Sequence, residues 1–440
     1  MSSRYAYLIA AVAAVSGLLF GFDTAVINGA LIFLRQELGL STRETEVATS
    51  SLLVGCAIGA AFAGWLTDRL GRKRILIASA LLFAVSAVGA ALPRNLGEFV
   101  AARLVGGLAI GMASVLAPLY IAEISPRAIR GRLVSLNQMA IVTGILLAYF
   151  VNWFLSFAGP SSWRWMFASA AIPSVAFFVA LLFVPESPRF LVEKGRDEEA
   201  LAVLERVGGA AQARLELREI RDTIAQEAGT LRELFAKRLR KPLGIAVFLA
   251  VFQQVTGINT VIYYGSLIFK EHVGGQSDSA AIGANVIIGS VNFLMTIVAL
   301  WTIDRLGRRP LMMLASGGMA VALFLLGFLF RFQPPPAVMI LVVILLYVAS
   351  FGVGLGPGVW VVISELFPTR IRGRAMSIAT LCLWLACILV TATFLSLVEA
   401  IGSTGAFWLY AAMSVLNFFF IWRVMPETKG RSLEEIERSW

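Results

Sequence analysis

Asp23 is the only charged residue in a long apolar stretch near the start of the chain, which includes LLFGFDTAVINGA at residues 18–30. An acid in such a setting is costly and is usually retained for function, facing a partner of opposite charge. Arg103 lies in another apolar stretch and offers that partner. Two interpretations fit the pair. It is a static ion pair that fixes helix packing, or a proton site in which desolvation favours the neutral acid and Arg103 favours the carboxylate.

A second group of polar side chains has the chemistry to bind a polyhydroxyl ligand. Gln253, Gln254 and Asn259 lie within seven residues of each other, and Tyr263 and Tyr264 follow them. Amides both donate and accept hydrogen bonds, as sugar hydroxyls do, without the desolvation cost of a charge. Their alternative role is to hold membrane helices together, at about 0.6 kcal/mol for each hydrogen bond.

The sequence offers little for other chemistry. With His272 as the single histidine, no histidine-based metal cluster or proton relay can form. Cys56, Cys382 and Cys387 lie in apolar stretches, and their spacing suits neither zinc nor an external disulfide. No phosphate loop or nucleophile motif is present. We therefore expect neither an enzyme nor a bound metal or cofactor.

Long apolar runs must position these residues. The chain has 440 residues, of which 58% are hydrophobic and only 15% charged, unlike a soluble domain. A run of about 20 apolar residues crosses roughly 30 Å of hydrocarbon as a helix. The first run lacks a signal-peptide cleavage pattern, so we expect it to be retained. Twelve membrane spans are predicted, at residues 6–29, 46–67, 75–93, 98–122, 133–157, 164–184, 243–269, 281–303, 311–331, 337–364, 375–398 and 405–425.

The basic residues predict the orientation of these spans. The connections after the second, fourth, eighth and tenth spans hold 13 Lys and Arg, whereas the odd-numbered connections together hold 6. This bias places both termini in the cytoplasm, and the short external loops favour a bacterial inner membrane. The net charge of +10 suits contact with anionic lipid. Because the basic clusters lie beside spans, we expect no nucleic-acid partner.

Two segments depart from the regular pattern of spans. Residues 186–241 hold 12 Lys and Arg and 11 Asp and Glu, with a helical DEEALAVLERV pattern that Gly208 and Gly209 close. They predict a short cytoplasmic helical insert. FGVGLGPGVW at residues 351–360 does not match a nucleotide-binding loop. Its glycines and Pro357 instead predict a locally broken helix that borders a cavity.

Repeated motifs divide the chain into two membrane halves. Three motifs recur at a similar separation and at the same places in the order of spans: DRLGRKRIL and DRLGRRPLM, EISPRAIRGR and ELFPTRIRGR, and PESPR and PETKG. Parallel repeats of this kind build transporters with a binding site near the membrane midplane. The predicted domains are an N-terminal six-helix half, a cytoplasmic linker, a C-terminal six-helix half and a cytoplasmic tail, at residues 1–185, 186–241, 242–426 and 427–440.

These motifs, together with QQVTGIN at the seventh span, resemble the sugar porter family of the major facilitator superfamily along nearly the whole chain. The resemblance implies an all-α membrane protein with twelve transmembrane helices in two pseudo-symmetric halves. It implies a monomeric alternating-access carrier that imports a monosaccharide, such as the hexose glucose, with a proton. A proton-independent sugar or polyol uniporter is the alternative. A non-transporting receptor would carry a long cytoplasmic tail, whereas 14 residues follow Pro426.

The resemblance also assigns roles to residues of this sequence. Asp23 and Arg103 couple the proton, since proton-driven members carry an acid at the first position and passive members an amide. The implied sugar contacts are Gln138, Gln253, Gln254, Asn259, Asn292, Trp360 and Trp384. The implied outer gate is formed by Tyr263, Tyr264, Gly356 and Pro357. Leu383 departs from the family pattern, because several relatives have a polar amide there.

Charged residues that recur in both halves imply a cytoplasmic gate. The preference of Lys and Arg for cytoplasmic loops explains the basic residues. It does not explain why acidic residues recur at equivalent positions of the two halves. We expect ion pairs that form when the carrier faces outward and break when it opens inward. The residues expected in this gate are Asp68, Arg72, Glu123, Arg127, Arg130 and Glu186, and then Asp304, Arg308, Glu365, Arg370, Arg372 and Glu427.

Overall fold

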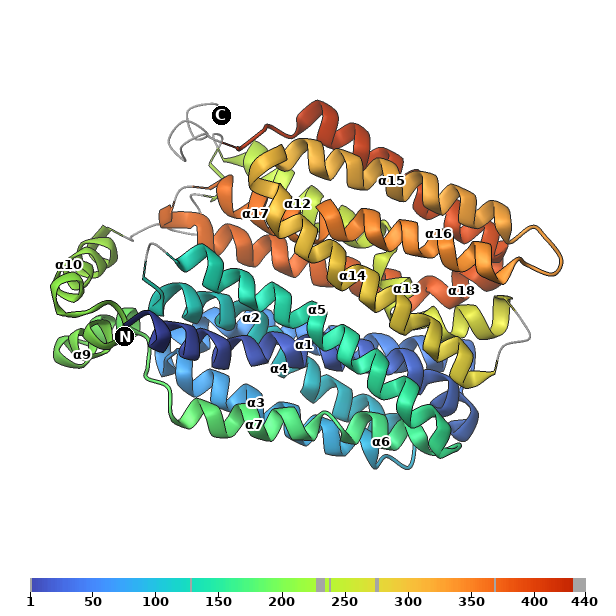
Figure 1. Cartoon of the computed structure of the whole chain (residues 1–440), viewed down its shortest axis with the longest axis horizontal. Coiled ribbons are helices and arrows are strands. Elements are labelled where there is room, and N and C mark those ends of the chain that lie inside the picture. The colour runs from blue at the N-terminus through green and yellow to red at the C-terminus, as the bar shows by residue number, and fades with distance from the viewer. Residues whose placement is uncertain are drawn as a thin grey trace. The chain divides into compact units, whose positions relative to one another are not determined.

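The computed structural model describes residues 2–126, 129–226, 234–236, 239–273, 277–367 and 369–429. These residues are almost entirely helical, and no strand occurs among them (Figure 1). The chain forms two compact units. Unit 1 consists of Met1–Asp23, Gly55–Gly144 and Phe167–Gly229, and unit 2 consists of Thr24–Val54, Ile145–Met166 and Thr230–Trp440. Three long helices contribute one part to each unit: α1 (Ser2–Leu38), α2 (Thr42–Leu70) and α5 (Arg130–Leu155).

Unit 1 is a helical bundle built around close backbone approaches. It adds α3 (Arg72–Ala91), α4 (Leu96–Ile124) and α7 (Ala171–Leu182), and α3 packs against both α4 and α7. Asn95 begins α4 by accepting a hydrogen bond from the backbone N–H of Glu98 at 3.0 Å. A Cβ on Gly59 of α2 would lie 2.4 Å from the backbone oxygen of Leu108, so a glycine here lets α2 and α4 approach closely.

Three short helices of unit 1 lie in the segment for which the sequence predicts a cytoplasmic insert, and the cytoplasmic position of this segment stays a prediction. They are α8 (Pro188–Glu193), α9 (Asp197–Gly208) and α10 (Ala210–Gln226), and α9 lies beside α10 (Figure 1). Leu191, Leu204 and Leu217 form a small apolar core between them. On the outer surface, Arg196 donates to Glu199, and this hydrogen bond lowers the pKa of the Glu199 carboxyl. Gly209 follows α9 with a φ of 86°, as the glycine pair in the sequence predicted.

Unit 2 contains the remaining helices. They are η1 (Ser156–Ala158), most of α6 (Ser162–Ala168), α12 (Arg240–Val255), α13 (Ile258–Leu267), η2 (Ile268–Val273), α14 (Asp278–Leu306), α15 (Arg308–Leu329), α16 (Ala337–Ser350), η3 (Phe351–Leu355), α17 (Gly356–Glu365) and α18 (Thr369–Val424). α18 packs against α12 and α15, and α15 packs against α16. Both η2 and η3 are π-helical segments, a form that often occurs at functional sites.

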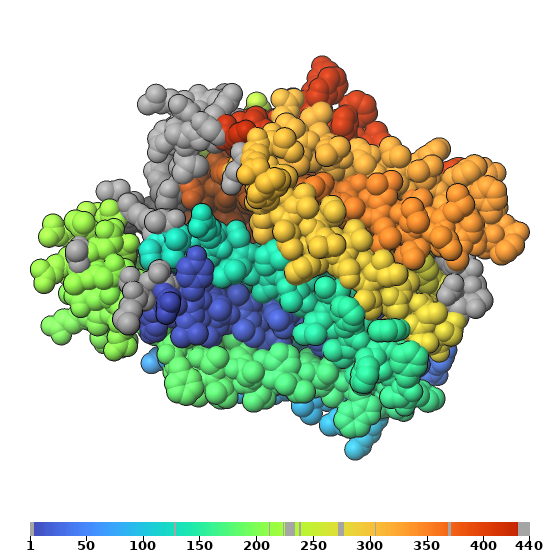
Figure 2. Space-filling view, in the orientation of Figure 1, coloured from blue at the N-terminus to red at the C-terminus, as the bar shows by residue number. Residues whose placement is uncertain are grey.

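The long helices agree with the predicted membrane spans. Eleven helices among the described residues are long and apolar enough to cross a membrane. One of them, α18, is divided at Gly402, whose φ of 73° is not helical, and it corresponds to the last two predicted spans. The exposed side chains of the helices are largely apolar, including Leu294 of α14, Leu314 of α15 and Val338 of α16. Figure 2 shows α14, α15 and α16, in yellow to orange, covering one face of unit 2 that suits lipid.

α1 is longer than the sequence predicted. The apolar run predicted a helix ending near residue 29, but α1 continues to Leu38. The extension is held by Glu37, which accepts hydrogen bonds from the indole N–H of Trp163 at 2.7 Å and from Arg164 at 2.8 Å. These contacts provide hydrogen-bond partners for the polar last turn of α1. Hydropathy alone did not predict that this turn belongs to the helix.

Candidate functional site

Asp23 of α1 and Arg103 of α4 form a buried ion pair in unit 1. Arg103 Nη1 donates to Asp23 Oδ1 at 2.6 Å, and Arg103 Nη2 donates to the backbone oxygen of Asp23 at 2.9 Å. Arg103 is 1% exposed and Asp23 is 5% exposed. The guanidinium therefore binds both the side chain and the backbone of one residue, which fixes α1 against α4 at this point.

The other carboxylate oxygen of Asp23 faces a tight polar space. Among the described residues, neither Asp23 Oδ2 nor Ser86 Oγ has a hydrogen-bond partner. A Cβ on Gly106 would lie 2.9 Å from Asp23 Oδ2 and 2.4 Å from Ser86 Oγ, so a larger residue there would displace one or both of these side chains. The Arg103 guanidinium lies 5.2 Å from the centre of the Phe167 ring, in a cation–π contact. One oxygen of Asp23 is thus bound by Arg103, and the other remains available for a proton.

The amides of the seventh predicted span lie at a break in that span. α12 ends at Val255 and α13 begins at Ile258, with Gly257 in the left-handed region at a φ of 88°. Gln253, just before the break, donates from Nε2 to the backbone oxygens of Leu355 at 2.8 Å and Gly356 at 3.0 Å. The break near Gly257 is therefore tied to the second break, where η3 meets α17.

Three of the expected sugar contacts form one chain of hydrogen bonds. Gln254 Nε2 donates to Gln253 Oε1 at 3.3 Å, and Asn259 Nδ2 donates to Gln254 Oε1. Asn259 Nδ2 also donates to Cys387 Sγ at 3.0 Å, which brings α18 into the group. Gln253 and Gln254 are buried, whereas Asn259 is partly exposed. These residues lie close together along the chain, on the two sides of the break between α12 and α13, and this short separation explains the grouping.

The other expected sugar contacts lie on separate elements. Asn292 of α14 is 9% exposed, and a Cβ on Gly352 of η3 would lie 3.4 Å from its side-chain oxygen. Trp384 of α18 is buried, and Trp360 of α17 is partly exposed. All of these residues belong to unit 2. Gln138 of α5 belongs to unit 1, where it is partly exposed.

The expected outer-gate residues are packed in unit 2. Tyr264 is fully buried, and its hydroxyl donates to the backbone oxygen of Thr391 at 2.7 Å. Tyr263 beside it is 5% exposed. Gly356 and Pro357 begin α17 directly after the π-helical η3, so the tenth predicted span is locally broken, as its sequence predicted.

A buried cluster around Asn28 was not predicted. Asn28 Nδ2 donates to the backbone oxygens of Val261 at 3.2 Å and Ile262 at 2.7 Å, and to Asn285 Oδ1 at 3.2 Å. Asn28 Oδ1 accepts from the backbone N–H of Ser266 at 3.1 Å and from its hydroxyl. We call Asn28, Ser266 and Asn285 the Asn28 cluster. It joins α1, α13 and α14 within unit 2.

Two further hydrogen bonds of unit 2 join α5 to α13 and to α1 near the Asn28 cluster. Tyr149 of α5 donates to the backbone oxygen of Ile262 at 3.1 Å, and Asn152 donates to that of Val26 at 3.0 Å. This is the end of the helices that the basic residues predict to face outside. The sequence shows Asn28 as a polar residue in an apolar span, but it contains no signal for its distant partners.

Each unit also holds one charged cluster at the predicted cytoplasmic end. In unit 1, Arg72 binds Glu123 through two hydrogen bonds of 2.9 and 2.8 Å. Glu186 accepts hydrogen bonds from the first backbone N–H groups of α3, those of Arg72 and Lys73, each at 3.1 Å. A carboxylate at this place stabilises the helix N-terminus. Gly71 precedes α3 with a φ of 92°.

Unit 2 repeats this arrangement. Arg308 donates to Glu365 at 2.9 Å, and Glu427 accepts from the backbone N–H groups of Arg308 at 3.1 Å and Arg309 at 3.0 Å. Gly307 precedes α15 with a φ of 96°. Both clusters join helices of a single unit. The role that we expect for them as a gate stays a prediction.

Several members of the expected gate have other positions. Asp68 is exposed, and among the described residues no cation lies within 4 Å of its carboxylate. Arg130 donates to the backbone oxygen of Ser125 at 3.3 Å, and Arg372 donates to that of Phe367 at 3.3 Å. Arg127, and the side chains of Asp304, Arg370 and His272, lie outside the described residues.

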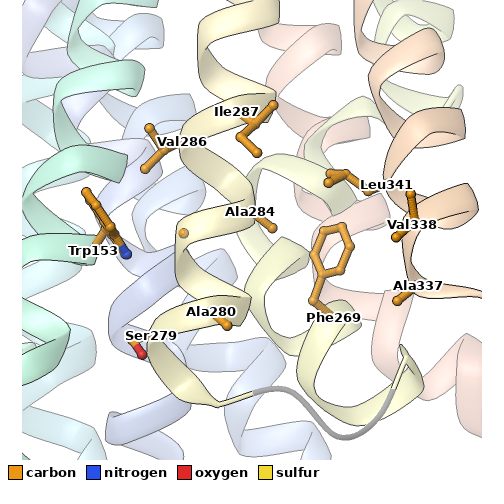
Figure 3. A pocket seen from close by; sticks show the side chains of 11 residues that line it. Trp153, Phe269, Ser279, Ala280, Ala284, Val286, Ile287, Ala337, Val338 and Leu341 are labelled. Carbon is orange, nitrogen blue, oxygen red and sulfur yellow. The ribbon is translucent and has the colours of Figure 1, made fainter.

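Unit 2 also contains an apolar crevice of about 480 Å³ (Figure 3). Trp153, Phe269, Ala284, Val338 and Leu341 are among the residues that line it. Its lining has neither charged groups nor side-chain amides, and Ser279 and Trp153 provide the hydrogen-bonding side chains among its lining residues. It is distinct from the hydrogen-bonded chain of Gln253, Gln254 and Asn259.

Comparisons with known proteins agree with this arrangement. A family model described as "Sugar (and other) transporter" matches residues 9–440. The arabinose-proton symporter of Bacillus subtilis (strain 168) is 41% identical over 446 residues, covering 100% of this chain and 96% of the relative. The D-xylose-proton symporter of Escherichia coli (strain K12) is 39% identical over 480 residues, with coverage of 100% and 96%. The solved structure of the proton:xylose symporter XylE bound to 6-bromo-6-deoxy-D-glucose matches with a TM-score of 0.86 and 38% identity, covering 100% of both chains.

Proposed function

Because this chain belongs to the sugar transporter family of the major facilitator superfamily, we propose that it imports a monosaccharide together with a proton by alternating access. The observation that carries the proton coupling is the buried Asp23–Arg103 pair, in which one carboxylate oxygen is bound and the other has no partner among the described residues. A static ion pair that fixes helix packing is the alternative role of these two residues.

Protonation of Asp23 changes the charge of the pair, because it leaves the buried Arg103 as the charged member. As a carboxylate, Asp23 is neutralised by Arg103 at 2.6 Å. A proton that binds Oδ2 removes the charge–charge attraction between the two side chains and so weakens their contact, while Arg103 keeps its hydrogen bond to the backbone oxygen of Asp23 at 2.9 Å. Protonation thus loosens α1 from α4 in unit 1 without separating them. We propose that this local change couples proton binding to movement of the helices.

For the sugar, we propose that its hydroxyls exchange hydrogen bonds with the chain of Gln253, Gln254 and Asn259. These amides already bind one another, so a sugar that replaces those bonds leaves no amide unsatisfied. Gln253 is also bound to the backbone at Leu355 and Gly356. Sugar binding at Gln253 therefore acts directly on the broken tenth span. Asn292, Trp360 and Trp384 of the same unit complete the proposed set of contacts.

We propose a pentose as the substrate, in preference to the hexose expected from the sequence. Two of the similar proteins are symporters of arabinose and D-xylose. The similar solved structure, however, holds a glucose derivative, so a hexose is also a candidate ligand. We further propose an inner-membrane location with both termini in the cytoplasm, supported by the distribution of basic residues.

The test is uptake of labelled arabinose, xylose and glucose into proteoliposomes, with and without an inward proton gradient. We expect the gradient to drive a pentose above its equilibrium level and to drive glucose less well. Equilibration that ignores the gradient would establish the uniporter, the alternative that we considered from the sequence. Failure to move any of the three sugars would contradict the proposed substrate class.

A further inference from the structure

Glu46 is a second buried acid, and the proposed transport cycle does not use it. It lies in the second turn of α2 and is 4% exposed. Its Oε1 accepts a hydrogen bond from the backbone N–H of Ser396 at 2.8 Å, and its Oε2 lies 2.7 Å from the Ser396 hydroxyl. Both bonds join α2 to α18 within unit 2. A buried acid that no mechanism explains is a candidate functional group.

Glu46 forms no salt bridge among the described residues. Among the described residues, no Lys or Arg nitrogen lies within 4 Å of its carboxylate. The titratable groups around Glu46 are Tyr264 of α13 and Tyr410 and Glu399 of α18. Two exposed charged residues, Arg43 and Glu44, lie in the first turn of α2 itself. An ionised Glu46 is therefore a buried charge without a counter-ion, which is costly.

The backbone N–H and the hydroxyl of Ser396 can both bind Glu46 whether or not its carboxyl group carries a proton. A backbone N–H can only donate, so Oε1 remains an acceptor in either state. A hydroxyl can donate or accept, so Ser396 can donate to an ionised Oε2 or accept from a protonated one. Both forms of Glu46 keep two hydrogen bonds, but only the neutral form avoids the buried charge.

The position of Glu46 connects its protonation to a conformation. Glu46 lies at the same end of the helices as the Asn28 cluster, the end predicted to face outside. Near it, Thr42 of α2 donates to Glu399 of α18. If α2 and α18 separate at this end, Glu46 becomes exposed to water, where the carboxylate is stable.

We propose that Glu46 is a second proton-binding site, and that a proton on its Oε2 favours the closed packing of α2 against α18. The proton comes from water when the two helices are apart and bonds to Oε2. It returns to water when they separate again. This site goes beyond the proposed sugar import, because its occupation requires neither sugar nor Asp23.

The experiment measures the distance between α2 and α18 at different pH values. Spin labels are placed at Val47 and Ile401, both exposed, in a variant whose three cysteines are replaced, and pulsed electron spin resonance is recorded in lipid nanodiscs without sugar. We expect the fraction with the short distance to be high at acid pH and to fall as the pH rises. In Glu46→Gln, which mimics the neutral acid, the fraction should stay at its acid value throughout.

Three further variants identify the group that titrates. Glu44→Gln changes an exposed acid two residues away and should keep the wild-type pH dependence. Asp23→Asn should also keep it, which separates this proposal from the proton coupling at Asp23. Ser396→Ala removes the hydroxyl but leaves the backbone donor, and should lower the closed fraction at acid pH. A wild-type pH dependence in Glu46→Gln, or its loss in Asp23→Asn, would overturn the proposal.

Discussion

Glu186 accepts a hydrogen bond from the backbone N–H of Arg72 at 3.1 Å, and Glu427 makes the same contact with Arg308 at 3.1 Å. Each acid follows the last span of its predicted half and caps the helix that begins after a positive-φ glycine. A Cβ on Gly71 would lie 2.4 Å from Glu186 Oε2, and one on Gly307 would lie 2.7 Å from Glu427 Oε2. The repeated sequence motifs thus encode the same local structure twice.

Removing either cap should destabilise its unit. We expect Glu186→Ala and Glu427→Ala each to lower the free energy of unfolding by about 1 to 2 kcal/mol, because helix N–H groups lose their acceptor. Thermal unfolding in detergent measures the effect. Glu198→Ala, in the exposed first turn of α9, is the matched comparison: its carboxylate accepts no hydrogen bond among the described residues, so the midpoint should fall less than in the two cap variants. Equal midpoints for all three variants would show that the caps do not stabilise the protein.

Gly106→Ala should disturb the Asp23–Arg103 pair without changing any charge. The added Cβ lies 2.9 Å from Asp23 Oδ2 and 2.4 Å from Ser86 Oγ, so the carboxylate must move, at a cost of roughly 1 to 3 kcal/mol. We expect proton-driven sugar accumulation to fall toward equilibrium. Gly64→Ala is the control, since nothing lies within 4 Å of its Cβ. Undiminished accumulation in Gly106→Ala would mean that the geometry of the pair is not required.

Gln254→Ala should weaken sugar binding. It breaks the chain that links Gln253 to Asn259, and loss of one hydrogen-bonding amide costs about 1 to 3 kcal/mol, or roughly 5-fold to 150-fold in affinity. Calorimetric titration with the transported sugar measures this change. Gln212→Ala, exposed on α10, should bind as the wild type does. Unchanged affinity in Gln254→Ala would remove this amide from the proposed site.

Asn28→Ala should destabilise the packing of α1 against α13 and α14 in unit 2. The substitution leaves buried partners at Ser266 and Asn285 without their amide, at a cost of about 1 to 3 kcal/mol. We expect slower transport with sugar binding retained, measured as uptake rate and calorimetric affinity. Ser290→Ala on α14 is the control, because its hydroxyl bonds only to its own helix at Val286. A wild-type uptake rate in Asn28→Ala would argue against a role for the cluster in transport.

Much of the fold follows from local sequence patterns. Apolar runs specify the spans, and the glycines at Gly209, Gly257 and Gly307 mark ends or breaks because each has a positive φ. The amide chain of the seventh span is also local, since its members lie close together along the sequence. The extension of α1 to Leu38 is different, because it depends on Trp163 and Arg164 more than a hundred residues away.

Long-range polar contacts were the least predictable. Asn28 bonds to Ser266 and Asn285, and Glu46 bonds to Ser396, across separations of more than two hundred residues. Nothing in the residue types or spacing specifies such partners, because any buried amide or acid needs some partner. The contact between Asp23 and Arg103 was predictable, unlike these. A buried acid needs a cation as its partner, and few cations lie in apolar stretches of the sequence.

We propose above all that Asp23 carries the coupled proton. The most direct measurement is accumulation of the transported sugar in proteoliposomes under an inward proton gradient, for wild type and Asp23→Asn, alongside sugar exchange without a gradient. We predict that Asp23→Asn exchanges sugar but no longer accumulates it above equilibrium. Gradient-driven accumulation by Asp23→Asn at the wild-type level would contradict the claim, and Asp23 would then be a structural partner of Arg103.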